Sequence, residues 1–197
     1  RKQHDIKDIG KGVVPMLVVM GLIGMLLMLE PDMGAFMVIV AITMGVIFLG
    51  GVNYKVFAAL VAALIAGFTA MVIFTPWRAA RLFAYLDPWT KDNAEGKAYQ
   101  LTPSLIAFGR GELFGVGLGD SVQKMFYLPE AHTDFILAVI GEEFGLIGVW
   151  AVILAFTVLV RRMFSIAREA MAFERTFQAL AVQGLGIWFG VQGFINM

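Results

Sequence analysis

Three ionisable side chains occupy alternate positions in Glu130-Ala131-His132-Thr133-Asp134, immediately before a long apolar stretch. Catalysis, metal binding and helix capping all use side chains of these types, and the spacing leaves the three alternatives open. The carboxylate of Asp134 would cap a helix that follows if it accepted the first free N–H groups. The same position favours an ionised carboxylate through the helix dipole, which suits a general base that must be unprotonated to act.

Metal binding has little support in the sequence. His132 and His4 are the only histidines and cysteine is absent, which excludes a His-Glu-x-x-His zinc site and zinc–thiolate sites. We therefore expect no metal site built by protein side chains alone.

Four basic residues precede this cluster, and they are Arg78, Arg81, Arg110 and Lys124. Such cations can neutralise a pyrophosphate at a membrane surface, and they can equally contact lipid head groups. Five glycines also crowd positions 109–119, where successive N–H groups can bind a phosphate. Because the GxGxxG spacing is not met and no Gly-Lys-Ser/Thr follows, we favour a flexible or tightly turned loop over phosphate binding.

Four further carboxylates interrupt apolar stretches. Glu30 and Asp32 flank Pro31, and we interpret them as a helix end at the membrane interface because proline cannot continue a helix. Glu142 and Glu143 fall about two turns into another apolar stretch, where an unpaired charge is expensive. At least one of this pair should face protein or a water-filled cavity, and helix packing is the interpretation that we favour.

The composition indicates what must position these side chains. Of the 197 residues, 59% are hydrophobic and 15% are charged, and the mean hydropathy of +0.81 is that of a membrane protein. Basic and acidic residues balance at 15 each, which gives no indication of a nucleic-acid partner. The charges leave uncharged runs long enough to cross a hydrocarbon core of roughly 30 Å as helices. We predict an all-α polytopic integral membrane protein, a single membrane domain over 1–197 with about five spans at 13–30, 33–52, 56–76, 135–160 and 177–197, and a long loop at 77–134.

Basic residues indicate the orientation, because short loops that carry them stay on the cytoplasmic side. They gather before the first span, at Lys55, and between the fourth and fifth spans. The turn at 30–32 and the long loop would therefore face the periplasm or the cell exterior. Within the loop, Thr102 as cap and Pro103 at the first helical position predict a short helix at the interface, where the loop's aromatic residues would also lie.

Several motifs of the chain agree with one known family. They are Tyr99-Gln100-Leu101, 104–112, 115–119, 121–124, 127–136, 141–145 and 30–34. In these segments the sequence resembles the SEDS family of peptidoglycan polymerases, and Ala131 is similar to the cell-division branch of that family. The resemblance covers essentially the whole chain and implies further spans on both sides. The chain opens without an initiator methionine and stops inside an apolar run, so we expect an internal piece of a longer protein.

The resemblance implies glycosyl transfer on lipid II, a disaccharide-pentapeptide carried on undecaprenyl pyrophosphate, at the outer face of the bacterial cytoplasmic membrane. It also implies a class B penicillin-binding protein transpeptidase and other division proteins as partners, besides membrane lipids. Asp134 would be the general base, Arg110 and Lys124 would stabilise the pyrophosphate leaving group, and a divalent cation, Mg or Mn, would share its charge. The remaining substrate contacts that we expect are Arg78, Arg81, Gln100, Glu130 and His132.

Two other functions use the same features differently. In one, the chain belongs to a flippase or transporter of lipid-linked oligosaccharides, with Glu142 and Glu143 in a polar cavity. In the other, it is a scaffold whose helices only dock a transpeptidase. Whichever applies, we expect the isolated chain to be unstable and inactive, because helices that normally bury polar positions would face lipid.

Overall fold

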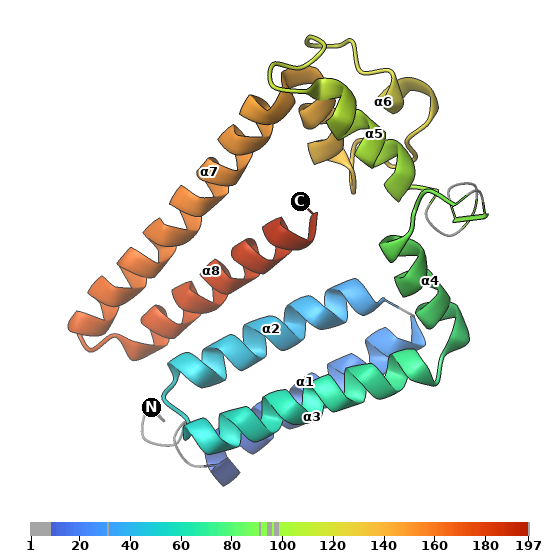
Figure 1. Ribbon diagram of the computed structural model, residues 1–197. Helices are drawn as coiled ribbons and strands as arrows, with labels where there is room; N and C mark the ends of the chain where they lie inside the picture. The colour runs from blue at the N-terminus through green and yellow to red at the C-terminus, as the bar shows by residue number, and fades with distance from the viewer. Residues whose placement is uncertain (1–8, 31, 91, 94–95, 97–98, 197) are drawn as a thin grey trace. The chain divides into compact units, whose positions relative to one another are not determined.

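Helices are the regular secondary structure of the protein in the part that the structure, a computed structural model, describes: residues 9–30, 32–90, 92–93, 96 and 99–196 (Figure 1). Helices make up 79% of the structure, and no strand occurs in those ranges. Three helical segments are long and apolar enough to cross a membrane: Gly10–Leu29, Tyr54–Ile73 and Ile136–Ala172. The predicted all-α polytopic membrane fold is confirmed. Pro31 and the basic residues at 1–8, which enter the predictions of the turn and of the orientation, lie outside the described ranges.

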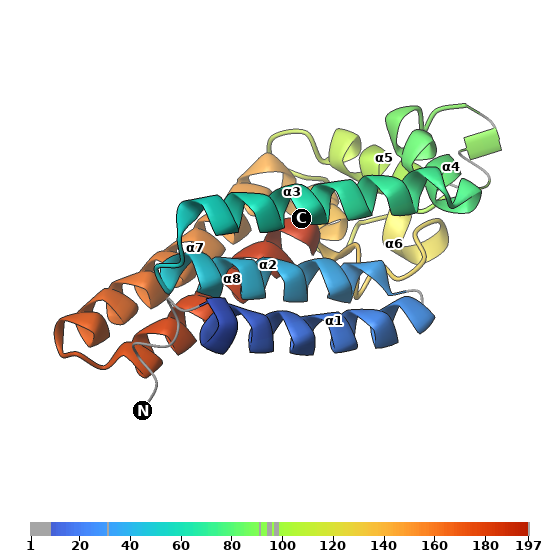
Figure 2. The same ribbon diagram turned by 90° about the horizontal axis from the view of Figure 1, so that it is seen from below.

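The chain divides into two compact units, of which the first comprises residues 1–63 and 156–195. It contains η2 (Ile9–Val13), α1 (Val14–Leu29), α2 (Met33–Leu49), the start of α3 (Tyr54–Ile73), the end of α7 (Ile136–Ala172) and α8 (Thr176–Asn196). Figures 1 and 2 both show α1 and α2 side by side. Val13, Ile47 and Val52 form the buried core at one end of this pair. A Cβ at Gly184 of α8 would lie 3.3 Å from Val46, so a small residue lets α8 approach α2 closely.

The turn between α1 and α2 is built by its two carboxylate residues. The N–H of Glu30 donates to Leu26 O at the end of α1, and Asp32 Oδ1 accepts a hydrogen bond of 3.0 Å from Ala35 N at the start of α2. Both side chains are exposed. They therefore lie at helix ends, as the turn interpretation predicts.

The second unit comprises residues 64–155 and 196–197. It contains the end of α3, α4 (Pro76–Leu86), α5 (Leu101–Gly111), α6 (Gln123–Phe126) and the start of α7. The predicted short helix is present as α5, but its predicted start is wrong. Gln100 is the N-cap residue, so α5 begins before Pro103, and Thr102 Oγ1 donates to Pro88 O at 3.2 Å instead of capping. This tertiary contact competes with the local capping preference.

The bounds of the helices agree in part with the predicted membrane spans. α1, α2 and α3 lie close to the first three predicted spans, whereas α7 continues beyond residue 160 to Ala172. The charges at Arg161 and Arg162 end the apolar run without ending the helix, because arginine is a good helix former. Met33–Leu49 is apolar but shorter than the three long segments, and α8 is not among the segments apolar enough to cross. The number and limits of the membrane crossings therefore stay predictions.

Candidate active site

The fourth predicted span is broken near its start. Gly145, which lies inside α7, has φ 65° and ψ −161°, and these backbone angles are not helical. Such a break removes the bonds that Leu146 N and Ile147 N would otherwise make to the carbonyls of Glu142 and Glu143, four residues earlier. Buried backbone groups must then find other partners.

The loop that follows α5 supplies those partners. Its carbonyls accept from α7, and its N–H groups donate to α7. The four bonds are Leu146 N to Glu112 O at 2.9 Å, Ile147 N to Leu113 O at 3.4 Å, Val116 N to Glu142 O at 2.9 Å and Gly117 N to Glu143 O at 3.1 Å. The loop therefore replaces two helical hydrogen bonds with four bonds between segments that lie about thirty residues apart in the sequence.

Glycine is required where this loop meets α7. A Cβ at Gly111 would overlap the carbonyl oxygen of Gly141, and one at Gly115 would overlap that of Glu143. Gly115 also has φ +80°, a left-handed conformation that other residues adopt at a cost. The tightly turned loop that we favoured for the glycine run is confirmed for Gly115, Gly117 and Gly119, which have positive φ, whereas Gly109 and Gly111 lie in α5.

Glu142 precedes the break at Gly145 by three residues. It is fully buried, with 0% of its side chain exposed. One oxygen, Oε1, accepts from Arg110 Nη1 at 3.1 Å and from Val122 N at 3.3 Å. The other, Oε2, accepts from Ser121 Oγ at 2.5 Å and from Gln123 N at 3.3 Å. Four donors from α5, the loop and α6 thus surround one carboxylate, which offsets the large penalty of burying its charge.

Glu143 has different partners: its Oε1 forms an ion pair with the ammonium of Lys124, and its carboxylate accepts backbone hydrogen bonds from Gly119 and Ser121. Its side chain is 7% exposed and that of Lys124 is 24% exposed, whereas that of Arg110 is 44% exposed. The expectation that at least one of the two glutamates faces protein is confirmed for both. The cations that we assigned to the pyrophosphate, Arg110 and Lys124, are thus brought together by the glutamate pair while parts of their side chains remain accessible.

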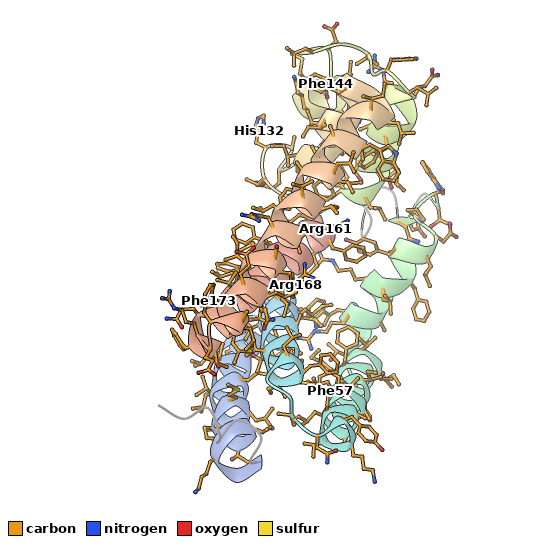
Figure 3. The ribbon with its side chains drawn as sticks, turned by 90° about the vertical axis from the view of Figure 1, so that its left-hand side faces the viewer. Phe57, His132, Phe144, Arg161, Arg168 and Phe173 are labelled. Atoms are coloured by element: carbon orange, nitrogen blue, oxygen red, sulfur yellow. The ribbon has the colours of Figure 1, made fainter. Side chains whose placement is uncertain are left out.

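The ionisable residues before α7 are in a contrasting environment. Asp134, His132 and Glu130 are exposed, and Figure 3 shows His132 pointing outward from its loop. The backbone of Glu130 has φ 54°. Its side-chain Oε2 accepts a hydrogen bond of 2.9 Å from Thr133 Oγ1. α7 begins at Ile136, and no capping hydrogen bond to the Asp134 carboxylate is found within the described ranges. The capping alternative for Asp134 is therefore wrong, because Phe135 O accepts from Ala138 N and Val139 N, so that Phe135 and not Asp134 is the residue before the helix.

The backbone under these exposed side chains is nevertheless fixed. Leu128 and Ala131 are 6% and 5% exposed and pack in one cluster with Ala107 of α5 and Ala138 of α7. Phe135 N also donates to Glu130 O at 3.3 Å. Asp134 is thus presented to the surroundings from a segment anchored to two helices.

The three remaining expected contacts lie elsewhere in the same unit. Arg78 and Arg81 are on α4, where the Arg78 guanidinium carbon lies 4.9 Å from the centre of the Trp77 ring and Arg81 is exposed. The Nε of Arg78 is buried with no hydrogen-bond partner among the described residues. Gln100 is half-buried at the start of α5. The described part of the chain contains no hydrogen bond or ion pair that joins these three to Arg110, Lys124 or Asp134.

Protein ligands for a divalent cation are not clustered. The described residues include no group of three or more His, Cys, Asp or Glu side chains that could hold a metal ion. The nearby carboxylates of Glu142 and Glu143 are already engaged by cations. The residues present do not fit a resident metal, and no reaction step is assigned to one.

Sequence reasoning missed Ser121 and the break at Gly145. Two adjacent glutamates in an apolar run require cationic or hydrogen-bonding partners, and the cations of the 109–124 segment were the available ones. That signal indicates that cations pair with the two glutamates, but it does not say which of the basic residues do so. It does not identify Ser121, whose contact with Glu142 depends on the fold of the loop.

The fold and this site define a polytopic helical membrane protein in which a polar loop is locked onto a broken span. Comparison with known families makes the assignment specific. The chain belongs to the FtsW/RodA/SpoVE family, because the family model described as "Cell cycle protein" matches residues 1–197.

Curated relatives match along the whole chain. A protein of Burkholderia thailandensis named "Probable peptidoglycan glycosyltransferase FtsW" is 64% identical over 197 residues, which cover 100% of this chain and 43% of the relative. Proteins of the same name from Thiomonas intermedia and Polynucleobacter necessarius are 54% and 52% identical over the whole chain, which covers 48% and 47% of their lengths. The chain thus spans about half the length of the curated relatives that it matches.

Proposed function

We propose that the protein containing this chain is a peptidoglycan glycosyltransferase that polymerises lipid II into glycan strands at the division septum. The printed names of the relatives support the reaction class. The observation that carries the proposal is the exposed carboxylate of Asp134 on a segment anchored to α5 and α7. An exposed, ionisable group on a fixed backbone is what a general base requires.

In the proposed reaction, Asp134 takes the proton of the acceptor's GlcNAc 4-hydroxyl as that oxygen attacks the anomeric carbon of the donor's MurNAc. The bond from that carbon to undecaprenyl pyrophosphate breaks, and the pyrophosphate keeps the bonding electron pair. Attack opposite the leaving group inverts the anomeric centre and converts an α-linked donor into a β-linked glycan.

Arg110 and Lys124 stabilise the negative charge that develops on the leaving pyrophosphate. Their side chains are 44% and 24% exposed, so both retain accessible surface beyond the carboxylates that they contact. Arg78, Arg81, Gln100, Glu130 and His132 make the remaining contacts to the lipid-linked disaccharide in this proposal.

The proposed location is the bacterial cytoplasmic membrane, with the loop at 77–134 facing the periplasm or cell exterior. Lipid II and membrane lipids contact the protein there, and a class B penicillin-binding protein transpeptidase and other division proteins are its partners. Arg161, Arg162 and Arg168 near the end of α7, and Arg175 between α7 and α8, support this orientation, because basic residues beside short loops stay in the cytoplasm.

The transporter alternative requires Glu142 and Glu143 to line an open polar cavity. Their side chains are 0% and 7% exposed even in this half-length chain, and further helices can only bury them more. This burial favours the glycosyltransferase over the transporter.

The experiment measures glycan strands formed from purified lipid II by the full-length protein assembled with its transpeptidase partner. Asp134→Asn and Asp134→Ala are compared with Asp120→Asn, which makes the same chemical change at an exposed aspartate of the same loop. We expect polymer to be lost in both Asp134 variants and retained in Asp120→Asn. Polymer at the unmodified rate from both Asp134 variants would reject the assignment of the base.

A further inference from the structure

We infer that Glu142 is a positioning residue for the proposed transfer: it holds the backbone that carries Lys124 and does not itself touch the substrate. The inference rests on the proposed function, in which Lys124 stabilises the leaving pyrophosphate. Nothing in the printed sequence distinguishes Glu142 from its neighbour Glu143. Their contacts in the structure do.

The contacts of Glu142 converge on the residues immediately before Lys124. Its carboxylate accepts from the backbone N–H of Val122 and of Gln123, at 3.3 Å each. It also accepts from Ser121 Oγ at 2.5 Å, and the same Oγ accepts from the N–H of Lys124 at 3.2 Å. An unbroken series of hydrogen bonds therefore runs from a fully buried carboxylate to the backbone of Lys124.

The same carboxylate also fixes the other proposed pyrophosphate ligand. Arg110 lies at the end of α5 and donates to Glu142 Oε1 at 3.1 Å. Because Arg110 and the backbone of Lys124 share this anchor, their relative position depends on one side chain. Glu143 forms an ion pair with the ammonium of Lys124 and accepts backbone hydrogen bonds from Gly119 and Ser121. Of the two glutamates, only Glu142 binds Arg110 and the backbone of the two residues next to Lys124.

Glu142 is itself held in place by its main chain. Glu142 O accepts from Val116 N at 2.9 Å, so the residue is held through its main chain as well as its side chain. A group that orients a reacting site acts best when its own position is locked in this way. A shift of about 1 Å in such a support can lower a rate up to roughly 100-fold although the support makes no contact with substrate.

The test is a double-mutant cycle in the full-length protein with its transpeptidase partner, with kcat/KM for lipid II as the readout. The variants are Glu142→Gln, Lys124→Ala and the double variant, and Glu169→Gln is the control. Glu169 is on the same helix in a pair with Arg162 that is 64% and 66% exposed. We expect Glu142→Gln to lower kcat/KM about 10- to 100-fold, and Glu169→Gln to leave it unchanged.

The double variant decides between positioning and general stability. If Glu142 acts through Lys124, adding Glu142→Gln to Lys124→Ala lowers kcat/KM by a clearly smaller factor than in the unmodified protein, and the remaining loss passes through Arg110. An equal loss in both backgrounds, or unchanged kcat/KM in Glu142→Gln, overturns the inference. If Glu142→Gln fails to fold, Ser121→Ala takes its place in the cycle, because it removes a single donor and leaves the ion pair with Arg110.

Failure of this inference is separable from failure of the proposed function. Unchanged activity in Lys124→Ala overturns the inference and leaves the role of Asp134 as base intact. Conversely, activity in Asp134→Asn rejects the base, while the coupling between Glu142 and Lys124 is still measured by the same cycle.

Discussion

Two pairs of acidic residues that are close together in the sequence have opposite environments. Glu142 and Glu143 are buried against cations, whereas Glu130 and Asp134 lie exposed just before the helix that carries the first pair. A buried carboxylate whose donors are all in place stabilises the fold, and its removal leaves those donors unsatisfied. An exposed one on an anchored segment is open to a substrate. We therefore propose a structural role for the first pair and a role in proton transfer for Asp134.

Removing the Asp134 carboxylate tests this separation most strongly. We expect Asp134→Ala to lower the polymerisation rate by about 10² to 10⁴, the usual contribution of a positioned base, with no change in thermal stability. Rate assays and thermal unfolding of the detergent-solubilised full-length protein measure the two quantities. A large fall in Tm would show that Asp134 also supports the fold and would blur the comparison.

Glu142→Ala should lower the stability of the protein as well as its activity. It leaves Arg110, Ser121 and two backbone N–H groups without their common acceptor. The side chain of Arg110 is 44% exposed and keeps its contact with the surroundings, but a buried donor left without a partner costs about 1–3 kcal/mol, so we expect a clear drop in Tm and in the yield of folded protein. Stability equal to that of the unmodified protein would mean that the buried pair does not hold the loop.

Two glycines of the loop separate the cost of a left-handed backbone from the cost of a steric overlap with α7. Gly115 and Gly119 both have positive φ, at +80° and +90°, but only Gly115 lies against the backbone of α7. We expect Gly119→Ala to destabilise by about 1 kcal/mol through backbone strain. Gly115→Ala should destabilise by more, because the added methyl overlaps the Glu143 carbonyl. Equal Tm values for the two variants would contradict the close packing.

The smallest effect is expected at an exposed pair on the same helix. Arg162 Nη1 and Glu169 Oε1 lie 4.0 Å apart, with side chains 66% and 64% exposed. Arg162→Gln should change stability by less than about 1 kcal/mol, since solvent screens such pairs. A loss comparable to that of Glu142→Ala would show that exposure is a poor guide to the role of a charge here.

The general architecture could be predicted because its signal is local. Long uncharged runs locate α1, α2 and α3, and the turn at Glu30 and Asp32 follows from residues that resist burial. The start of α5 could not be predicted from the sequence, because Thr102 forms a hydrogen bond with Pro88 instead of capping the helix. The continuation of α7 past Arg161 was also missed, since a charge marks the end of an apolar run and not of a helix.

For the candidate site, the sequence identifies the residue types but not their pairing. The burial of Glu142 and Glu143 follows from their position in an apolar run. Their partners do not, because Arg110 lies 32 residues away from Glu142 and the contact depends on the break at Gly145. A glycine within an apolar run is compatible with an uninterrupted helix, so only the tertiary arrangement reveals that break. The role of Asp134 stays a prediction.

The exchange of hydrogen bonds at the break has a consequence for the motion of the loop. Residues 112–117 complete the backbone pairing of α7, so the loop cannot lift away unless the helix re-forms its own bonds or leaves four groups on each side unsatisfied. The amide protons of Val116, Gly117, Leu146 and Ile147 should therefore exchange with deuterium together, as one cooperative unit. Opening at this place is a single event shared by two segments that are far apart along the chain.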